Sequence, residues 1–490
     1  MKHTRHGYWL EEAGGVEPLP ALSGEWSADV VVVGGGYTGM WAAWRLKALE
    51  PGARVVLLES EVCGHGPSGR NGGFCNVMWF SLPNMRARWG DEAALAVARA
   101  SLEAVGDVES FCREQEVDAW FRRGGYLQVS TAPAHDGSWD EPVAACRELG
   151  EGEAVEPLDA AGVAARCASP AFRGGAFYPD AATVQPARLA LGLRQRLREA
   201  GVEIFERSPV RRLTGASDIR PAGAWSKSDA VRAETDRGVV RAGRAIVAVG
   251  AAARATRGPL QDRLTVTSSH IVLTEPVPDV LEEVGWTGGE CITDSRALID
   301  YFRTTPDGRI AFGWGGGRIA AGARLGGRAE VDPGAIAAAA GRLYEYFPAL
   351  REPGGGRDAP GGRDAPARIT HAWGGPIDVS PTHLPIVVPL PGGRAFAAAG
   401  YTGNGVGPSC MVGRVLASLA LDRRDDHSRL PFVDPSPARV PPEPLHWLGG
   451  EAIRRALGRR EEAELAGRRP DSLSALVSRI PELIGFHIGR

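Results

Sequence analysis

Three glycines stand between a run of valines and an apolar stretch near the start of the chain. Gly34, Gly36 and Gly39 have the spacing that allows a tight turn, the close approach of backbone to a pyrophosphate, and the packing of a helix on a strand. A helix that begins here would direct amide donors and the positive end of its dipole at that pyrophosphate. Glu59, 20 residues after Gly39, would accept hydrogen bonds from ribose hydroxyls. The pattern predicts a dinucleotide site.

The residues around these glycines predict the elements that position them. Residues 29–34 and 54–59 have the apolar, β-branched composition of buried strands, and residues 37–49 between them have helical character. Together they form a βαβ unit, which implies a parallel sheet. Strand and helix patterns of the same kind recur at 186–206, 245–250 and 394–421. We therefore expect one doubly wound α/β sheet of the Rossmann type, assembled from discontinuous segments.

Segments of a different character lie between these. They alternate apolar and polar residues like antiparallel strands, and Thr-Pro-Asp-Gly at 305–308 is a hairpin signal. The segments are 124–130, 173–179, 268–276 and 299–314. They predict a second, α+β domain with an antiparallel sheet, inserted into the first. A Gly-Gly-Arg-Asp-Ala-Pro unit that occurs twice in tandem at 355–366 is typical of an exposed loop.

A second glycine-rich run, residues 64–74, favours FAD over NAD as the dinucleotide. The run is too rich in glycine for an ordinary connection to the next helix. Such a segment can lie along a flavin with its backbone amides facing phosphate and ring.

At this point the chain resembles the glycine/D-amino-acid oxidase superfamily. Ser-Gly-Arg-Asn-Gly-Gly at 68–73 looks like that family's flavin-contact segment, and Ser-Pro-Val at 208–210 is similar to the strand whose valine backbone holds adenine. Residues 245–251 resemble its "ATG-like" strand. Residues 399–407 are similar to the segment whose amides reach the N1/O2 side of the flavin. Four ordered motifs are far more specific than one glycine pattern alone.

The resemblance covers about residues 28–425, and residues 373–385 look most like the gamma-glutamylputrescine oxidase branch. The expected FAD contacts are Gly34, Gly36, Tyr37, Thr38, Gly39, Glu59, Ser60, Ser68, Gly69, Arg70, Asn71, Gly72, Gly73, Val210, Gly250, Gly400, Gly403, Asn404, Gly405 and Val406. The expected domains are an FAD-binding domain (28–105, 181–262 and 371–425), a substrate domain (106–180 and 263–370) and a C-terminal helical extension (426–490). We expect that extension to dock on the surface without a catalytic role.

The resemblance implies oxidation of an amine by direct hydride transfer. A hydride would leave the carbon next to nitrogen for flavin N5, and the imine would hydrolyse to an aldehyde or ketone plus an amine or ammonia, with O2 as the electron acceptor. One alternative is an FAD-dependent dehydrogenase or tailoring enzyme that acts on an amino acid or a non-amine substrate with another acceptor. A flavin-binding protein without turnover is another.

Four polar residues are candidates for the substrate face. In the relatives a strand tyrosine often meets the substrate, which points to Tyr301, and Arg303 would share its strand face. Asp378 and His383 fall in a segment that passes over the flavin in the family. The alternatives are a half-buried core tyrosine, an exposed strand arginine and an ordinary polar turn. His270, in an apolar strand, is expected to be structural.

The chain departs from its relatives in three places. Ala311 stands where sarcosine oxidases have an oxygen-activating lysine, so oxidase activity is less secure than flavin reduction. Ser68 occupies the place of a flavin-linking histidine, and residues 373–388 contain no cysteine, so we expect FAD to be bound non-covalently, although Cys63, His65 and Cys75 stand nearby. Gly375 takes the place of an arginine that grips the substrate carboxylate in α-amino-acid oxidases.

Composition limits the remaining function classes. Of 490 residues 43% are hydrophobic and the net charge is −3, so nothing favours nucleic acid or an anionic membrane as a partner. Seven scattered cysteines without a Cys-x-x-Cys pair argue against a zinc site and fit the reducing cytoplasm. We expect no membrane span, no signal peptide and no metal, and the pattern does not indicate an oligomeric state.

Overall fold

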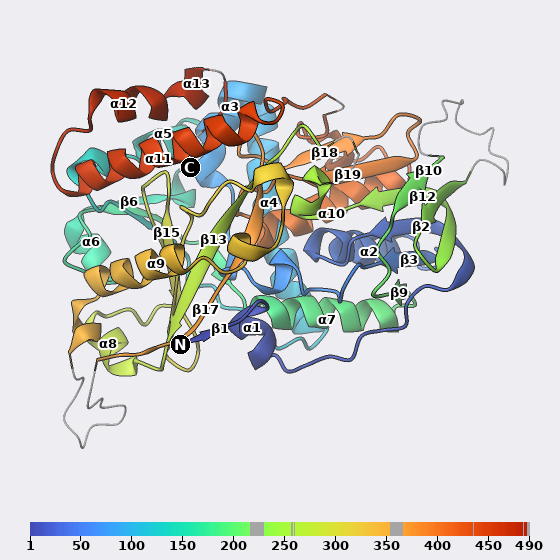
Figure 1. Ribbon diagram of the computed structural model, residues 1–490, viewed down its shortest axis with the longest axis horizontal. Helices are drawn as coiled ribbons and strands as arrows, with labels where there is room; N and C mark the ends of the chain where they lie inside the picture. Colours follow the sequence, from blue (N-terminus) through green and yellow to red (C-terminus); the bar gives the residue numbers. More distant parts are fainter. Residues whose placement is uncertain are drawn as a thin grey trace.

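The computed structural model describes residues 1–215, 230–255, 258, 260–352, 366–434, 436–483 and 485–487. These residues form two large sheets, each with helices packed against it (Figure 1). The expected combination of a doubly wound α/β domain and an antiparallel-sheet domain is confirmed. The tandem repeat at 355–366 lies outside the described residues except for its last residue.

The first sheet contains the parallel strands that the glycine motif predicts. In spatial order these are β19 (Ala395–Ala399), β12 (Gly238–Val247), β2 (Gly24–Val33), β3 (Val55–Leu58) and β9 (Glu203–Phe205). Three antiparallel strands extend it: β10 (Arg212–Thr214), β11 (Val231–Glu234) and β18 (Ile386–Pro389). The Val30–Val33 end of β2 and all of β3 are buried, because helices cover both faces of a parallel sheet.

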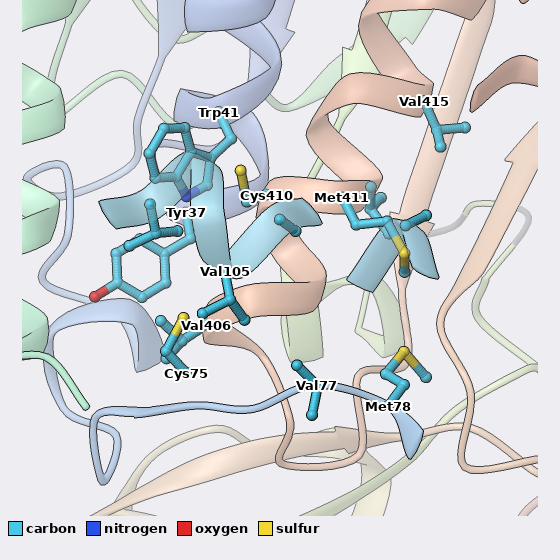
Figure 2. Close-up of a cluster of buried hydrophobic side chains, with 14 of the residues drawn as sticks. Tyr37, Trp41, Cys75, Val77, Met78, Val105, Val406, Cys410, Met411 and Val415 are labelled. Atoms are coloured by element: carbon cyan, nitrogen blue, oxygen red, sulfur yellow. The ribbon is translucent and has the colours of Figure 1, made fainter. Parts of the chain in front are cut away.

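Helices α2 (Tyr37–Leu49), α4 (Asp91–Glu114) and α10 (Val406–Ala420) pack together in a large apolar core of this domain (Figure 2). The α2–α10 contact is close because Gly413 faces Trp41, and a Cβ at Gly413 would lie 2.7 Å from the Cβ of Trp41. This contact carries the start of both helices to the same end of the sheet. Helix α7 (Pro186–Glu199) begins with proline, and the Gln185 side chain caps it.

The second sheet has nine strands, and β13, β15, β16 and β17 form its antiparallel centre. In spatial order they are β1 (Lys2–His3), β17 (Ile369–Val379), β13 (Thr265–Thr274), β16 (Ile310–Trp314), β15 (Asp300–Thr304), β14 (Cys291–Asp294), β5 (Tyr126–Val129), β7 (Gly175–Tyr178) and β6 (Glu156–Leu158). A two-stranded sheet joins β4 (Phe74–Cys75) and β8 (Ala182–Thr183). Residues 305–309 form the turn between β15 and β16, as the hairpin signal predicts. Strand β1 adds residues from the start of the sequence to this sheet, beside β17.

Nine further α-helices complete the described part of the chain. They are α1 (Gly7–Glu12), α3 (Leu82–Trp89), α5 (Asp140–Glu148), α6 (Ala160–Ala164), α8 (Pro278–Glu283), α9 (Pro333–Tyr346), α11 (Leu445–Leu465), α12 (Ser472–Ser478) and α13 (Ile480–Leu483). Helix α9 covers a core rich in aromatic rings, including Phe302, Phe312 and Phe347. Helices α11, α12 and α13, drawn in red, lie along the half of the molecule that contains the second sheet (Figure 1).

Candidate FAD-binding and active site

One cavity of about 760 Å³ is lined by residues from both sheets and from the C-terminal helices. The parallel sheet contributes the carboxyl ends of its strands, where ligands bind in doubly wound folds. The second sheet contributes β13, β15 and β17. A site of this kind can hold a dinucleotide along one wall and a small molecule against the other.

The turn after β2 has the geometry that the glycine motif requires. Gly34 has a φ of 109°, and a Cβ there would lie 2.3 Å from the carbonyl oxygen of Ala248. A Cβ at Gly39 would lie 2.0 Å from the carbonyl oxygen of Gly34, so only glycine allows α2 to pack this close to β2. Gly36 lines the cavity immediately before the first residue of α2.

Glu59 lies beside this turn at the end of β3 and lines the cavity together with Ser60. Its Oε2 accepts a hydrogen bond from the Gly35 N–H at 2.7 Å, and its Oε1 accepts one from the Glu61 N–H at 2.8 Å. The carboxylate therefore joins the glycine turn to the loop after β3. Val210, predicted to hold adenine, lines the same part of the cavity.

The flavin-contact segment is held in place by hydrogen bonds from several sides. Ser68 Oγ accepts the Tyr37 N–H at 2.9 Å, and the Asn71 side chain accepts the Gly73 N–H at 2.7 Å. The indole N–H of Trp373 donates to the Arg70 carbonyl at 2.8 Å, and that of Trp9 donates to the Asn71 carbonyl at 2.9 Å. The backbone of this segment is thus fixed along the cavity wall.

The start of α10 forms a second backbone wall. Gly403 has a φ of 84°, and no heavy atom lies within 4 Å of the position that a Cβ at Gly403 or Gly405 would take. The same openness holds at Gly250. These backbones face the cavity directly, so they form a cradle for a flat, polar-edged ligand. The amides of Val406 and the next residue, at a helix N-terminus, are free of intrahelical partners and favour negative charge.

Sixteen of the twenty expected cofactor contacts line the cavity, and four glycines do not. Those four are Gly39, Gly69, Gly73 and Gly400. Gly39, Gly69 and Gly73 allow another backbone to approach closely instead: a Cβ at Gly73, for example, would lie 2.1 Å from the Val184 carbonyl oxygen. Gly400 packs against side chains, and a Cβ there would lie 2.9 Å from the Cβ of Ser380. Tyr37 acts through its backbone, because its phenol donates to the Pro186 carbonyl in the core.

Tyr301 of β15 lines the same cavity. Its hydroxyl lies 2.6 Å from the Ser269 hydroxyl, and its ring crosses Gly313, where a Cβ would lie 2.1 Å from the ring. Burial raises the pKa of Tyr301 well above its ordinary value, so the phenol stays protonated. A neutral hydroxyl network can orient a polar substrate group here.

Asp378, near the end of β17, and His383, on the segment that follows this strand, also line the cavity. The Asp378 carboxylate accepts the Gly400 N–H at 2.6 Å, and burial raises its pKa to about 6. His383 has a left-handed φ of 57°, and its ring meets that of His487 edge to face at 5.3 Å. Three of the four predicted substrate-side residues are therefore brought to one cavity.

Arg303 does not line the cavity. Its side chain is buried, and its Nη1 donates to the Val184 carbonyl at 2.5 Å and to the Gly73 carbonyl at 3.4 Å. The guanidinium holds β15 to the end of the flavin-contact segment. His270 has an equally structural position, since its Nε2 accepts the Asp332 N–H at 3.2 Å.

Sequence reasoning missed several cavity residues. Tyr401, whose hydroxyl lies 2.7 Å from that of Thr38, joins the two helix starts, and Ser269 holds Tyr301. The largest omission is the C-terminal extension. Contrary to the expectation of a surface attachment, Arg454 of α11 and His487 near the chain's end line the cavity. Neither residue belongs to a recognisable sequence motif, so only the tertiary structure identifies them.

Three further features concern cofactors and membranes. Cys63, His65 and Cys75 do not line the cavity, and all seven cysteines are buried, free thiols. Among the described residues no group of three or more His, Cys, Asp or Glu side chains is arranged to hold a metal ion. No helix in the described part of the chain is long and apolar enough to cross a bilayer.

The fold and the glycine-lined cavity define an FAD-binding oxidoreductase. The family model described as "DAO: FAD dependent oxidoreductase" matches residues 29–419, and the chain belongs to this family of FAD-dependent enzymes, whose members act on amino acids and amines. The residues that line the cavity fit FAD, because glycine backbones and two helix N-termini face the space where phosphates and a flavin ring would lie.

Known proteins resemble the chain along most of its length. It is 27% identical to a probable oxidoreductase, OrdL, of Rhizobium meliloti over 85% of this chain and 89% of that protein. It is 26% identical to gamma-glutamylputrescine oxidoreductase of Escherichia coli over 88% of this chain and 92% of that protein. The structure of glycine oxidase from Geobacillus kaustophilus matches the fold with a TM-score of 0.65, at 19% identity over 83% of this chain and 98% of that one.

Proposed function

We propose that this FAD-dependent enzyme oxidises an amine at the carbon next to nitrogen. The imine product would hydrolyse to an aldehyde or ketone plus an amine or ammonia. The observation that carries the proposal is that Tyr301 and Asp378 line the same cavity as the flavin-contact segment. Bound FAD would supply the hydride acceptor, at flavin N5.

Asp378 is suited to receive the amine end of the substrate. With a pKa of about 6 its carboxylate is ionised at neutral pH, and it has one oxygen committed to the Gly400 N–H. The ionised carboxylate would attract an ammonium group and accept an N–H hydrogen bond from it. Tyr301, held by Ser269, offers an oriented hydroxyl as a second polar group. Orientation of the reacting carbon is the protein's main contribution to such a reaction.

The backbone at the start of α10 would stabilise the electrons that arrive. Helix amides and the positive end of the helix dipole lower the free energy of negative charge placed beside them. Apolar side chains such as Ile271, Trp373 and Leu457 exclude water from the opposite wall. Both features favour transfer of a hydride to the flavin over loss of a proton to water.

Gly375 supports an amine rather than an α-amino acid as the substrate. It lines the cavity in β17, opposite Ser269 in the sheet, and no heavy atom lies within 4 Å of the position of a Cβ. The arginine that resemblance would put here in α-amino-acid oxidases is missing, and a buried carboxylate without a partner costs several kcal/mol. The relative from Escherichia coli, named for gamma-glutamylputrescine, supports the same substrate class.

We further propose that O2 accepts the electrons, that FAD is bound non-covalently and that the enzyme works in the cytoplasm. The free thiols of all seven cysteines support a reducing compartment. Ala311 is buried and lies outside the cavity wall, so any activation of oxygen must come from groups other than a lysine at this position. Transfer to another acceptor, by a dehydrogenase, is the alternative.

Anaerobic mixing of the yellow holoenzyme with defined compounds tests the proposal. The panel contains primary amines, polyamines, N-methyl amino acids and D-amino acids, and the flavin absorbance reports reduction. We expect at least one amine to bleach the flavin, and reoxidation by air to produce peroxide. Bleaching by amino acids alone would support the amino-acid alternative, and bleaching without peroxide would support the dehydrogenase.

A further inference from the structure

One face of helix α11 forms part of the cavity wall. Gly450, Ile453, Arg454 and Leu457 line the cavity, and their spacing of three and four residues places them on the same side of a helix. The family match ends at residue 419, before α11 begins. This part of the wall therefore lies outside the fold that the family model describes.

Helix α11 is fixed to two cavity-lining loops of the substrate sheet. Glu451 Oε1 accepts the Ile319 N–H at 2.9 Å, and Glu461 Oε1 accepts the Leu298 N–H at 2.8 Å. A Cβ at Gly450 would lie 3.3 Å from the Ile319 side chain, so the helix fits closely at this point. The position of its inner face is thus set by contacts at both ends.

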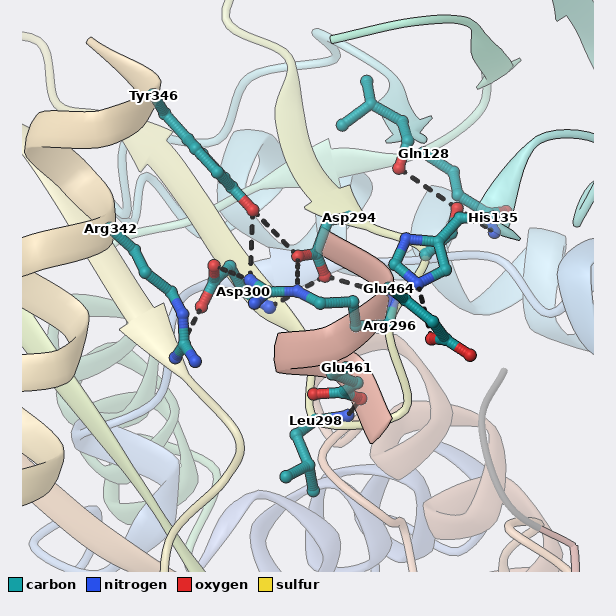
Figure 3. Close-up of polar contacts among 12 residues, drawn as sticks. Gln128, His135, Asp294, Arg296, Leu298, Asp300, Arg342, Tyr346, Glu461 and Glu464 are labelled. Carbon is teal, nitrogen blue, oxygen red and sulfur yellow. Dashed lines mark hydrogen bonds and ion pairs between the residues drawn. The ribbon is translucent and has the colours of Figure 1, made fainter. Parts of the chain in front are cut away.

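The Leu298 loop is itself held by a buried polar network (Figure 3). Arg296 forms ion pairs with Asp294 and Asp300, and the Tyr346 hydroxyl lies 2.9 Å from the Asp294 carboxylate. The side chains of this network are almost fully buried. Its rigidity supports Glu461 and, through α11, the orientation of the cavity-facing side chains.

Arg454 is the charged residue on this inner face. Its Nε and Nη2 are held by the Glu451 carboxylate, at 3.2 and 2.9 Å, and its Nη1 has a long contact of 3.4 Å to the Gly316 carbonyl. The Nε–Nη2 edge of the guanidinium is therefore fixed, while Nη1 has hydrogen-bonding capacity left for a ligand. Gly317, next to Gly316, also lines the cavity.

The charges of the cavity wall divide into two groups. On the dinucleotide side, Arg5 and Arg70 pair with Glu61 and Glu330. Among the described residues, the other Asp, Glu, Lys and Arg side chains of the lining are Glu59 on the dinucleotide side, Asp378 of β17 and Arg454 of α11. A carboxylate and a guanidinium in one cavity match a substrate with a cationic end and an anionic end.

We propose that Arg454 is a specificity-determining residue, which binds a carboxylate or similar anionic group several bonds away from the oxidised carbon. The inference rests on the proposed amine oxidation and names its substrate class: an amine with a remote anionic end. A fixed guanidinium is a strong and oriented partner for a carboxylate. In this proposal a residue of the C-terminal extension, and not the buried Arg303, binds the anionic group.

The test compares two amines that differ only in a terminal carboxylate, such as 6-aminohexanoate and hexylamine, in anaerobic flavin reduction. For wild type we expect tighter apparent binding of the carboxylated amine. In Arg454→Gln its apparent dissociation constant should rise about 10- to 100-fold, as expected for the loss of a charge-assisted hydrogen bond. The limiting rate of reduction should change less than threefold, and hexylamine should be unaffected. Arg454→Lys, which keeps the charge, should recover part of the loss.

Arg455 provides a matched control on the same helix. Its side chain is 66% exposed and also approaches Glu451, at 3.8 Å, so Arg455→Gln removes the same charge without changing the cavity wall. Equal loss in Arg454→Gln and Arg455→Gln, or no loss in either, would overturn the proposal.

A binding measurement separates this inference from the proposed function. Short aliphatic carboxylates, such as hexanoate, are titrated into the holoenzyme and the shift of the flavin spectrum is followed. We expect hexanoate binding by wild type and Arg455→Gln, and at least tenfold weaker binding by Arg454→Gln. If no amine reduces the flavin but this difference appears, the amine chemistry is wrong and the anion site stands. If amines reduce the flavin and hexanoate binds all three proteins equally, the anion site is wrong.

Discussion

The hydroxyl groups of Tyr301 in β15 and Ser269 in β13 lie 2.6 Å apart, although strand β16 runs between these two strands of the second sheet. Ser269 also donates to the Trp314 carbonyl at 2.9 Å, so Tyr301 is the end of a short chain of hydrogen bonds that starts in the backbone. Serine in β13 therefore sets the direction in which the phenol faces the cavity.

We expect Tyr301→Phe to slow anaerobic flavin reduction by amines about 3- to 10-fold, because one oriented hydrogen bond is lost. FAD occupancy should stay unchanged. Stopped-flow absorbance measures the rate, and Tyr344→Phe, which removes a hydroxyl bonded to the Ala367 carbonyl outside the cavity, is the control. Ser269→Ala should add little to Tyr301→Phe if the two act as one unit. Fully additive effects would contradict that coupling.

Glu59→Ala should weaken FAD binding more than it changes the chemistry. The variant loses the hydrogen bonds that the Gly35 and Glu61 amides donate to the charged carboxylate, and each such bond contributes about 1.5–3 kcal/mol. FAD per polypeptide after gel filtration measures the effect. Glu203→Ala, an exposed glutamate in β9, is the control. Full occupancy combined with lost turnover would contradict the assignment.

Gly375→Arg should increase the affinity for α-amino acids about tenfold relative to the matching amines, since a guanidinium would enter the cavity beside Ser269. The backbone tolerates a side chain here, because a Cβ would meet no heavy atom within 4 Å. Gly375→Ala controls for added volume. The comparison uses apparent dissociation constants from flavin reduction. If simple D-amino acids or glycine reduce the wild-type flavin faster than every amine, the substrate class proposed here is wrong.

Glu461→Gln should change the pH dependence of stability. Burial raises the pKa of Glu461 to about 7, from an ordinary value of 4.5. The folded protein therefore binds more protons than the unfolded chain between these values, and wild type loses stability as pH rises from about 4.5 to 7. Glutamine removes this loss, so the variant should gain about 1–3 kcal/mol relative to wild type between pH 5 and pH 8. Denaturant titrations measure the gain.

Glu462→Gln is the matched control for that experiment. Glu462 is the next residue of α11 and is exposed, so its substitution should leave the pH dependence as it is in wild type. A parallel change in both variants would assign the effect to helix charge and not to the buried carboxyl.

Acid precipitation of the holoenzyme should leave the yellow colour in the supernatant. The nucleophiles closest in sequence to the flavin-contact segment, Cys63, His65 and Cys75, lie outside the cavity wall, and burial raises the pKa of the Cys63 thiol. A coloured pellet would demonstrate a covalent link.

The sequence predicts an element's bounds correctly where residues close together in the chain determine them. Helix α2 spans Tyr37–Leu49, the predicted residues, because glycines set its start and apolar residues fill its body. The first strand, however, begins at Gly24 rather than at residue 29. Its additional residues pair with β12, beginning with Gly24 and Gly238, which lie more than 200 residues apart in the sequence. The residues around Gly24 alone cannot predict that pairing.

The assignment of Tyr301 and Arg303 illustrates the same limit within one strand. The two side chains share a face of β15, as the period of two predicts. Different parts of the molecule cover that face: the open cavity beside Gly72 at Tyr301, and the backbone of Gly73 and Val184 at Arg303. Periodicity gives the face of a side chain, and only the tertiary structure gives its neighbours. For the same reason, the sequence did not predict that Arg454 lines the cavity.

Residues from Arg5 to His487 line the single cavity described above. A ribosome adds His487 to the chain long after Arg5. Strand β19 pairs with β12 and α10 packs on α2, so the dinucleotide wall itself forms late in synthesis, and the enclosure is incomplete until α11 and the segment around His487 have left the exit tunnel. We therefore expect FAD to be held tightly only after these segments have been synthesised, and nascent chains stalled before α11 should release FAD faster than chains that contain it.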